Sequence, residues 1–73
     1  MQSRIFAIVV DDTLYFKVGD ANRADYEVAG ALSFTYESRG KRVKISYWRV
    51  PDEVLEDEDQ LRIWAEKAWQ VII

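Results

Sequence analysis

The stretch Arg-Ile-Phe-Ala-Ile-Val-Val-Asp-Asp-Thr-Leu-Tyr-Phe-Lys-Val at residues 4–18 decides the fold of this chain. Its first part, residues 4–10, is rich in β-branched side chains and predicts a strand that is buried on both faces. Asp11 and Asp12 predict a tight turn, because aspartate tolerates unusual backbone angles and its side chain bonds to nearby backbone groups. Residues 13–18 return as a second strand, so the stretch predicts a β-hairpin.

A short helix is predicted next, over residues 21–29. Gly19 breaks the preceding strand, Asp20 is a good N-cap, and Gly30 suits the position that follows a helix. We expect one apolar stripe of this helix to face the core. The stripe consists of Ala21, Ala24 and Val28, with Tyr26 flanking it.

A second hairpin follows this helix. Residues 33–37 form its first strand, residues 38–41 form its turn with Gly40 free to take positive φ, and residues 43–50 form its return strand. Pro51 stops this strand, because proline cannot donate a hydrogen bond to a ladder. The return strand alternates, with one set opposing the other: Val43, Ile45 and Tyr47 against Lys44, Ser46 and Trp48.

The last predicted element is a helix whose start is marked by Asp57. Asp57 and Gln60 form an Asp-x-x-Gln pattern that resembles a capping box, and acidic residues at this end suit the helix dipole. Trp69 falls to one side of the apolar stripe, so a position in the core and a position in an interface are both alternatives for it. The stripe consists of Leu61, Ala65, Ala68 and Ile72, widened by Trp64 and Val71.

The element order is therefore β-β-α-β-β-α within one domain over residues 1–73. It predicts an α+β fold, a two-layer α/β sandwich whose largely antiparallel four-stranded sheet carries helices on one face. The other face is then open, and a contiguous aromatic patch on it marks an interface. Because tryptophan is also favoured at binding hot spots, we predict four interface residues. They are Tyr15, Trp48, Trp69 and Ile72.

Composition argues against an enzyme. The 73 residues include no cysteine and no histidine, which removes the usual ligands of zinc, haem and iron–sulfur sites and excludes nucleophile–imidazole pairs. The scattered glycines form no phosphate-binding loop. The acidic runs at 11–12 and 57–59 lack the spacing of a calcium loop and are explained as a turn and a helix cap. We predict no catalytic residue, no metal ligand and no cofactor.

The cytoplasm is the expected compartment. The apolar run at residues 5–10 is too short for an export signal and far too short for a membrane span. The lack of cysteine leaves no mark of secretion. We therefore expect no membrane partner.

Charge is segregated along the chain. Residues 39–49 hold five basic side chains and no acidic one, whereas residues 52–59 hold six acidic side chains and no basic one. Such blocks mark a bipolar surface or a self-complementary contact; the plainer interpretation is a solvated hairpin followed by an acidic helix start. Arg49 stands near Asp52 and Glu53 and is expected to pair with them.

The basic hairpin is also a candidate nucleic-acid contact, with Trp48 stacking on a base. The net charge of −3 and the lack of a recognisable nucleic-acid-binding motif argue against it, so this reading is not favoured. The candidate contact residues are Arg39, Lys41, Arg42, Lys44 and Arg49.

Several motifs, taken together, resemble the N-terminal domain of the TfoX/Sxy family, and they cover nearly the whole chain in unbroken order. The least common string is Ser-Tyr-Trp-Arg-Val-Pro-Asp-Glu at residues 46–53. The others are Asp-Thr-Leu-Tyr-Phe-Lys at residues 12–17, Asn22-Arg23, Phe34-Thr35-Tyr36, Leu61, Trp64-Ala65 and Ala68.

The resemblance implies a sandwich of the secretion-chaperone-like type. Family members begin with an extra helix and strand that include a Met-Phe-Gly-Gly-like stretch, and this opening segment has no counterpart ahead of Met1. A sheet without that segment exposes an edge and an apolar face, so we expect a homodimer. A misplaced start codon or a trimmed chain is the competing explanation.

The resemblance also implies a function. Family members that regulate natural competence are thought to assist a transcription activator, and they carry a C-terminal helical domain that this sequence, ending at Ile73, does not include. Because the resemblance covers only the N-terminal domain of those regulators, it gives weak support for the same regulatory role in this chain. We expect a non-enzymatic protein-interaction module that assists competence-type transcriptional regulation. The alternatives are direct nucleic-acid contact through the hairpin at residues 39–49 and a small-molecule pocket between sheet and helix.

Overall fold

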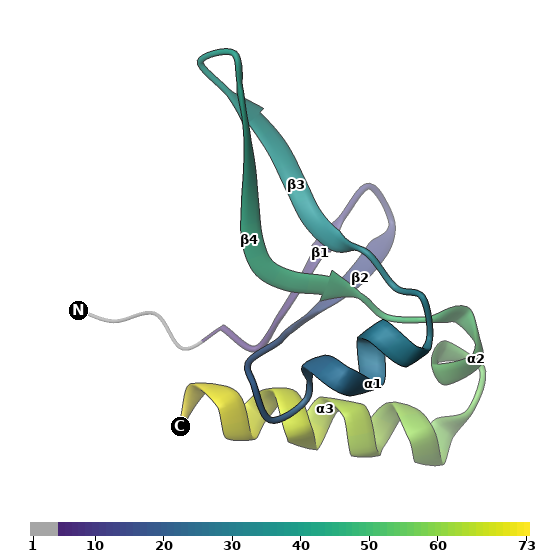
Figure 1. The fold of residues 1–73 in the computed structure, drawn as a ribbon. Coiled ribbons are helices and arrows are strands. Elements are labelled where there is room, and N and C mark those ends of the chain that lie inside the picture. The colour runs from purple at the N-terminus through teal and green to yellow at the C-terminus, as the bar shows by residue number, and fades with distance from the viewer. Residues whose placement is uncertain (1–4) are drawn as a thin grey trace.

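The computed structural model describes residues 5–73, so Arg4 of the predicted first strand lies outside the described residues. The described part forms one sheet with helices packed on one side of it (Figure 1). This arrangement confirms the predicted α+β sandwich. The elements are β1 (Ala7–Val10), β2 (Thr13–Lys17), α1 (Arg23–Val28), β3 (Ser33–Ser38), β4 (Lys41–Arg49), α2 (Asp52–Leu55) and α3 (Glu58–Ile72).

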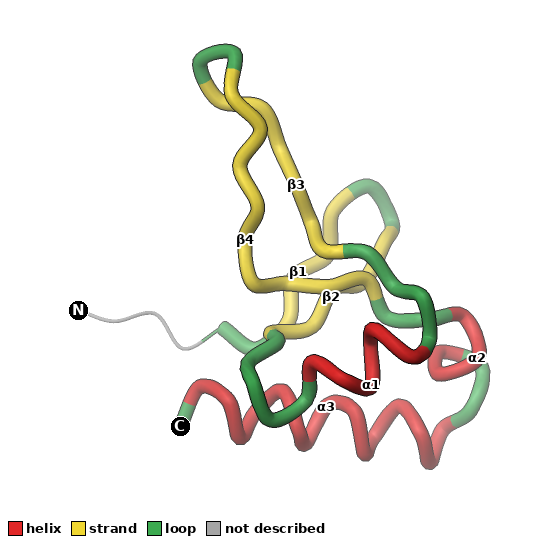
Figure 2. The backbone as a smooth tube through the Cα atoms, in the orientation of Figure 1, coloured by secondary structure: helices red, strands yellow, loops and turns green. Residues whose placement is uncertain are grey.

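The sheet has the order β1-β2-β4-β3, and each neighbouring pair is antiparallel. The two predicted hairpins are joined by a short ladder between β2 and β4, in which Phe16 lies opposite Trp48. An irregularity in register separates Ser33 from Thr35 on β3. Near this point β4 bends, so the outer part of the β3–β4 hairpin projects away from the helices (Figures 1 and 2).

Both hairpin turns use the left-handed backbone region. Asp11 and Asp12 have φ values of 51° and 61°, and Arg39 and Gly40 have values of 53° and 76°. Two consecutive positive φ angles define the type I′ turn, whose twist matches that of the flanking strands. The turn predicted at Asp11 and Asp12 and the positive φ predicted at Gly40 are confirmed.

The core lies between the sheet and α3, and Tyr26 of α1 is at its centre. Tyr26 is 1% exposed, and its ring packs edge-on against Trp64 with the centroids 4.6 Å apart. The Trp48 ring on β4 also packs against Tyr26, with the centroids 6.0 Å apart. The buried apolar residues of the described chain are Phe16, Val18, Tyr26, Val50, Val54 and Ala68.

The start of α1 differs from the prediction. The helix begins at Arg23 with Asn22 at the N-cap position, whereas Asp20 forms an exposed ion pair with Arg23 at 3.4 Å. Asn22 is buried, and its side chain is satisfied there because it accepts a hydrogen bond from the Gly19 N–H at 2.8 Å and donates one to the Lys17 carbonyl at 3.1 Å. These bonds fix the start of α1 to the end of β2.

The predicted apolar stripe of α1 is also wrong. Ala21 and Ala24 are exposed, and Val28 is 89% exposed. The large ring of Tyr26 takes the core position instead, and a helix of six residues has only one buried side. The predicted flanking residue is therefore the residue that faces the core.

The chain reverses into α3 through α2, a single turn that the sequence did not predict. Val54 of α2 is buried against the core. The predicted cap of the last helix is confirmed, since an Asp57 carboxylate oxygen accepts hydrogen bonds from the N–H groups of Asp59 and Gln60 at 3.0 and 3.2 Å. This cap satisfies two of the N–H groups that a helix start leaves free.

Replacing Asp57 with alanine is expected to lower the free energy of unfolding by about 1 kcal/mol, because the cap is lost. Chemical denaturation followed by circular dichroism measures the change. Glu56→Ala is the matched control, since it removes a neighbouring carboxylate that caps nothing in the described chain. Equal stabilities of Asp57→Ala and Glu56→Ala would contradict the prediction.

The Tyr26 hydroxyl is buried without a hydrogen-bond partner among residues 5–73. Burial, assisted by the negative charge of Asp25, raises the pKa of Tyr26 well above its usual range. An unsatisfied buried hydroxyl is unfavourable, so Tyr26→Phe is expected to raise the free energy of unfolding by about 1 kcal/mol at neutral pH.

The same substitution predicts a pH dependence. The folded chain keeps the proton on Tyr26 at a pH where the unfolded chain, with an ordinary tyrosine pKa near ~10, loses it. Unfolding is then favoured as pH rises above ~10, whereas below it this group contributes no pH dependence. The stability advantage of Tyr26→Phe over the natural chain should therefore widen in alkaline solution. Denaturation curves at two pH values test this, and a constant difference would refute it.

Candidate interaction surface

The sheet face opposite the helices, here called the open face, is rich in aromatic rings. Cross-strand pairs place Tyr15 beside Ile8 and Tyr36 beside Val43 on this face. The Tyr15 and Phe34 rings meet edge-on with centroids 5.0 Å apart. Most of these side chains are half-buried, and Tyr36 is 45% exposed. The apolar members are Ile8, Val10, Tyr15, Phe34, Tyr36, Val43, Ile45 and Tyr47.

The charged side chains that share the open face are basic. Lys17 lies opposite Tyr47, and its ammonium nitrogen is 5.0 Å from the centre of the Tyr47 ring. The Tyr47 hydroxyl donates a hydrogen bond to the Ile5 carbonyl at 2.7 Å, which holds the ring in place. Glu37, the one carboxylate in the described strands, pairs in register with Arg42 on the opposite face. The open face therefore combines aromatic rings with positive charge.

The projecting end of the β3–β4 hairpin, here called the basic tip, carries four exposed cations. Its residues come from the turn and the start of β4, where the strand extends beyond the helices (Figure 1). They are Arg39, Lys41, Arg42 and Lys44. These four belong to the predicted nucleic-acid contact set, and the structure brings them together.

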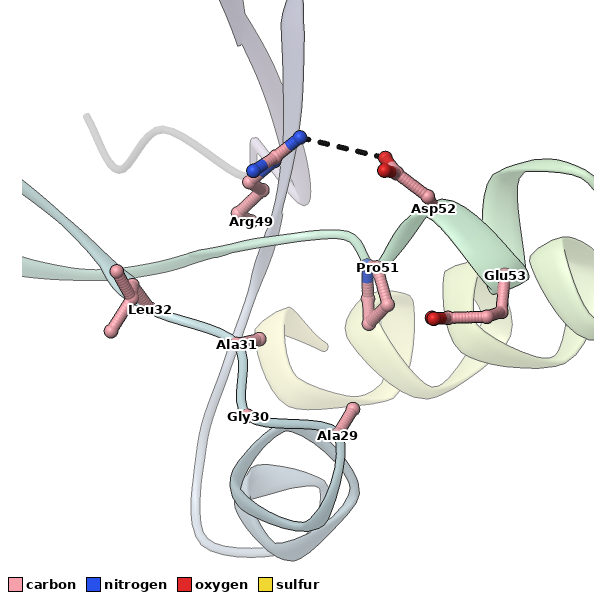
Figure 3. Close-up of a pocket in the computed structure, with 8 residues that line it drawn as sticks. All are labelled: Ala29, Gly30, Ala31, Leu32, Arg49, Pro51, Asp52 and Glu53. Carbon is pink, nitrogen blue, oxygen red and sulfur yellow. Dashed lines mark hydrogen bonds and ion pairs between the residues drawn. The ribbon is translucent and has the colours of Figure 1, made fainter.

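Arg49, the fifth predicted contact residue, is separate from the basic tip. It lies at the far end of β4 opposite Tyr15, and its guanidinium is 3.5 Å from a carboxylate oxygen of Asp52. This ion pair, predicted from the sequence, borders a surface hollow of about 220 Å³ that Pro51 and Glu53 also line (Figure 3). Both partners are more than half exposed, so solvent screens the pair and it contributes little stability.

The hollow offers no cradle for an anion. Figure 3 shows the Arg49 guanidinium directed toward Asp52 and the Glu53 carboxylate directed toward Pro51. Two carboxylates beside one guanidinium leave this region with net negative charge. The rest of the lining comes from the chain between Ala29 and Leu32 and from Pro51. The hollow therefore lies where the segment after α1 meets the segment that leads into α2.

Trp48 does not lie on the open face, which corrects the prediction. It pairs with Phe16, so its side chain lies on the face that the helices cover, where it packs against Tyr26. The predicted alternation along β4 is confirmed, but Trp48 lies on the covered face of the sheet and Tyr47 lies on the open face. Val43 and Ile45 lie in the projecting hairpin, and beyond the bend Trp48 and Val50 reach the core. Trp48 is thus also unavailable as the predicted base-stacking partner.

The other predicted interface residues occupy mixed environments. Tyr15 lies on the open face, as expected. Trp69 is 45% exposed and meets Phe6 edge-on at 5.9 Å, beside a shallow apolar groove between α3 and the start of the described chain. Ile72 is half-buried on α3. Tyr36 and Tyr47 also lie on the open face and are absent from the predicted set, although their alternation with polar residues is the signal that places them on one face.

Among residues 5–73, histidine, cysteine and carboxylate side chains form no group of three that could hold a metal ion. None of the helices in this same range has the length and apolar character needed to cross a membrane.

Comparison with known proteins identifies one family. The family model of the TfoX N-terminal domain matches residues 1–72. No curated protein matches the sequence.

Substitutions at two tryptophans are expected to separate core from surface. Trp48→Ala removes a ring packed against Tyr26 and should lower the free energy of unfolding by about 3 kcal/mol. Trp69→Ala removes a more exposed ring and should lower the free energy of unfolding by about 1 kcal/mol. Trp48→Phe keeps a ring at this position and provides a folded variant for comparison. Urea denaturation measures all three, and a larger loss for Trp69→Ala than for Trp48→Ala would contradict this assignment.

Proposed function

The chain belongs to the TfoX N-terminal domain family, and on this premise we propose that it is a protein-interaction module that acts through the open face of its sheet. In this proposal the module is non-enzymatic, works in the cytoplasm and assists transcriptional regulation of the competence type. The observation that carries the proposal is the aromatic open face, which the helices of the described chain leave uncovered (Figure 1).

The exposure of the open face supports an interaction role. Monomeric soluble proteins rarely expose large contiguous apolar patches, and such patches mark binding sites. Tyr36 is 45% exposed, and its ring continues the cluster formed by Tyr15 and Phe34, at 6.3 Å from the Phe34 ring. Tyrosine is enriched at interface hot spots because it contributes a large rigid ring and a polar end.

The chemistry of the side chains supports a non-enzymatic role. The sequence lacks histidine and cysteine, the residues that most often act as general base or activated nucleophile. The carboxylates of Asp11 and Asp12 lie in an exposed turn, and that of Asp57 caps α3. These groups have structural explanations, so binding is the simpler activity.

A second candidate function is nucleic-acid binding through the basic tip. Its four exposed cations support this candidate, as does the neighbouring aromatic ring of Tyr36. The acidic segment at residues 52–59 and the net charge of −3 weigh against it. A salt titration with a labelled oligonucleotide separates the candidates, because affinity based on phosphate contacts falls steeply with salt.

Replacing Tyr36 with aspartate tests the proposed function. The substitution places a charge on the open face at an exposed position, so the fold is retained while an apolar contact is lost. In the organism that encodes the chain, we expect transcripts of the competence genes to fall to the level of a strain that lacks the chain. Val28→Asp is the matched control, since Val28 is 89% exposed on α1, away from the open face. Normal transcript levels with Tyr36→Asp would contradict the proposal.

A further inference from the structure

The charges of this chain are collected at two places that lie far apart. The basic tip lies at the end of the projecting hairpin, and the acidic segment, residues 52–59, lies around α2 and the start of α3 at the other side of the molecule (Figure 1). The molecule is elongated, with extents of 40 × 29 × 22 Å. A bipolar body of this kind is complementary to a second copy of itself turned end for end.

Both charged regions keep free charge in the folded chain. Of the acidic segment, Asp52 pairs with Arg49 at 3.5 Å and Asp59 with Arg62 at 3.7 Å. Within residues 5–73, Glu53 and Glu56 form no ion pair, and neither do the four cations of the basic tip. Charges that find no partner within one copy are available to another.

Each charged region also has an exposed apolar side chain in or beside it. The open face carries Tyr36 on the projecting hairpin next to the basic tip, and Tyr36 is 45% exposed. The acidic segment contains one exposed apolar side chain, Leu55, at 41% exposure. Each region therefore offers an apolar group beside its charges, as interfaces with an apolar centre and a charged rim do.

We propose that the partner of the open face is a second copy of this chain, bound antiparallel so that the basic tip of each copy contacts the acidic segment of the other. This inference rests on the proposed function, because it names the occupant of the same surface. The arrangement is a two-fold symmetric dimer in which each copy uses the same surface, so every ionic contact occurs twice. Charge sets the orientation, and burial of apolar side chains from the open face adds affinity.

Salt dependence follows from this geometry. Exposed charges separated by more than about 10 Å are screened at ~0.1 M salt, and contacts at an interface rim weaken as salt rises. The dimer dissociation constant should therefore increase about tenfold or more between low and high salt, since several rim pairs contribute. A dimer formed by apolar contact alone responds little.

Two charge-reversed variants test the proposal by sedimentation equilibrium of the full chain. The tip variant combines Lys41→Glu, Arg42→Glu and Lys44→Glu, which changes the charge of the basic tip from +4 to −2. The acidic variant combines Glu53→Lys, Glu56→Lys and Glu58→Lys. Together with Arg49 and Arg62, which pair with Asp52 and Asp59, this changes the charge of the acidic region from −4 to +2. These positions avoid Arg39, whose φ of 53° is strained, and the cap residue Asp57. Each variant alone places like charges at both contacts, so each should be monomeric, with a mass near 8.6 kDa.

An equimolar mixture of the two variants should recover the dimer. In the mixed pair the negative tip of one copy meets the positive segment of the other, and the natural tip of the second meets the natural segment of the first. Both contacts are again attractive. Glu27→Lys with Glu66→Lys is the control for the acidic variant, because it also replaces exposed glutamates with lysines, but on α1 and α3 outside the acidic segment, and should leave the dimer intact.

Three results would overturn the proposal. One is a natural chain that stays monomeric at low salt up to about 100 μM, a weak limit for a specific complex. Another is a dimer that survives both charge reversals. The third is a monomer whose basic tip binds a single-stranded oligonucleotide, which supports the nucleic-acid candidate. If the chain is monomeric while Tyr36→Asp still abolishes the transcript response, the proposed function stands and its partner is a different protein.

Discussion

The contact of Tyr26 with Trp64 and Trp48 joins the two layers of this small protein. Tyr26 belongs to α1, Trp64 to α3 and Trp48 to β4, so a single ring fixes both helices against the sheet. A chain of this size buries a small core, and loss of one large contact within it affects the whole domain. The buried amide of Asn22 complements this contact by tying the start of α1 to the end of β2.

The bend in β4 decides which residues belong to the core and which belong to the surface. Before the bend, the strand pairs only with β3 and extends past the helices; after it, Trp48 and Val50 lie beneath them. One strand thus contributes to two different environments. The projecting part carries the basic tip and part of the open face, and the proposals for partner binding depend on this separation.

Local rules predicted the features that neighbouring residues determine. The paired aspartates predicted the first turn, Gly40 predicted part of the second, and Asp57 predicted the cap of α3. The rotation of α1 was not predictable from its own residues, because Tyr26 takes the core position by packing against Trp48 and Trp64, which lie far along the chain. The direction in which Trp48 points was not predictable either, since alternation gives two faces without saying which one the helices cover. The sequence indicated an open face, and Tyr15 is the one aromatic member that was named for it; Phe34, Tyr36 and Tyr47 share this face without having been named.

The ladder between β2 and β4 is the sole strand pairing that connects the two hairpins within residues 5–73, and its register holds only three residue pairs. So short a seam holds the inner strands together at one end and leaves the outer lengths of both hairpins without backbone hydrogen bonds to each other. The edge-on rings of Tyr15 on β2 and Phe34 on β3, with centroids 5.0 Å apart, add a side-chain contact between the two hairpins beside this seam. A smaller side chain at either position would remove that contact while leaving the three backbone pairs of the seam in place.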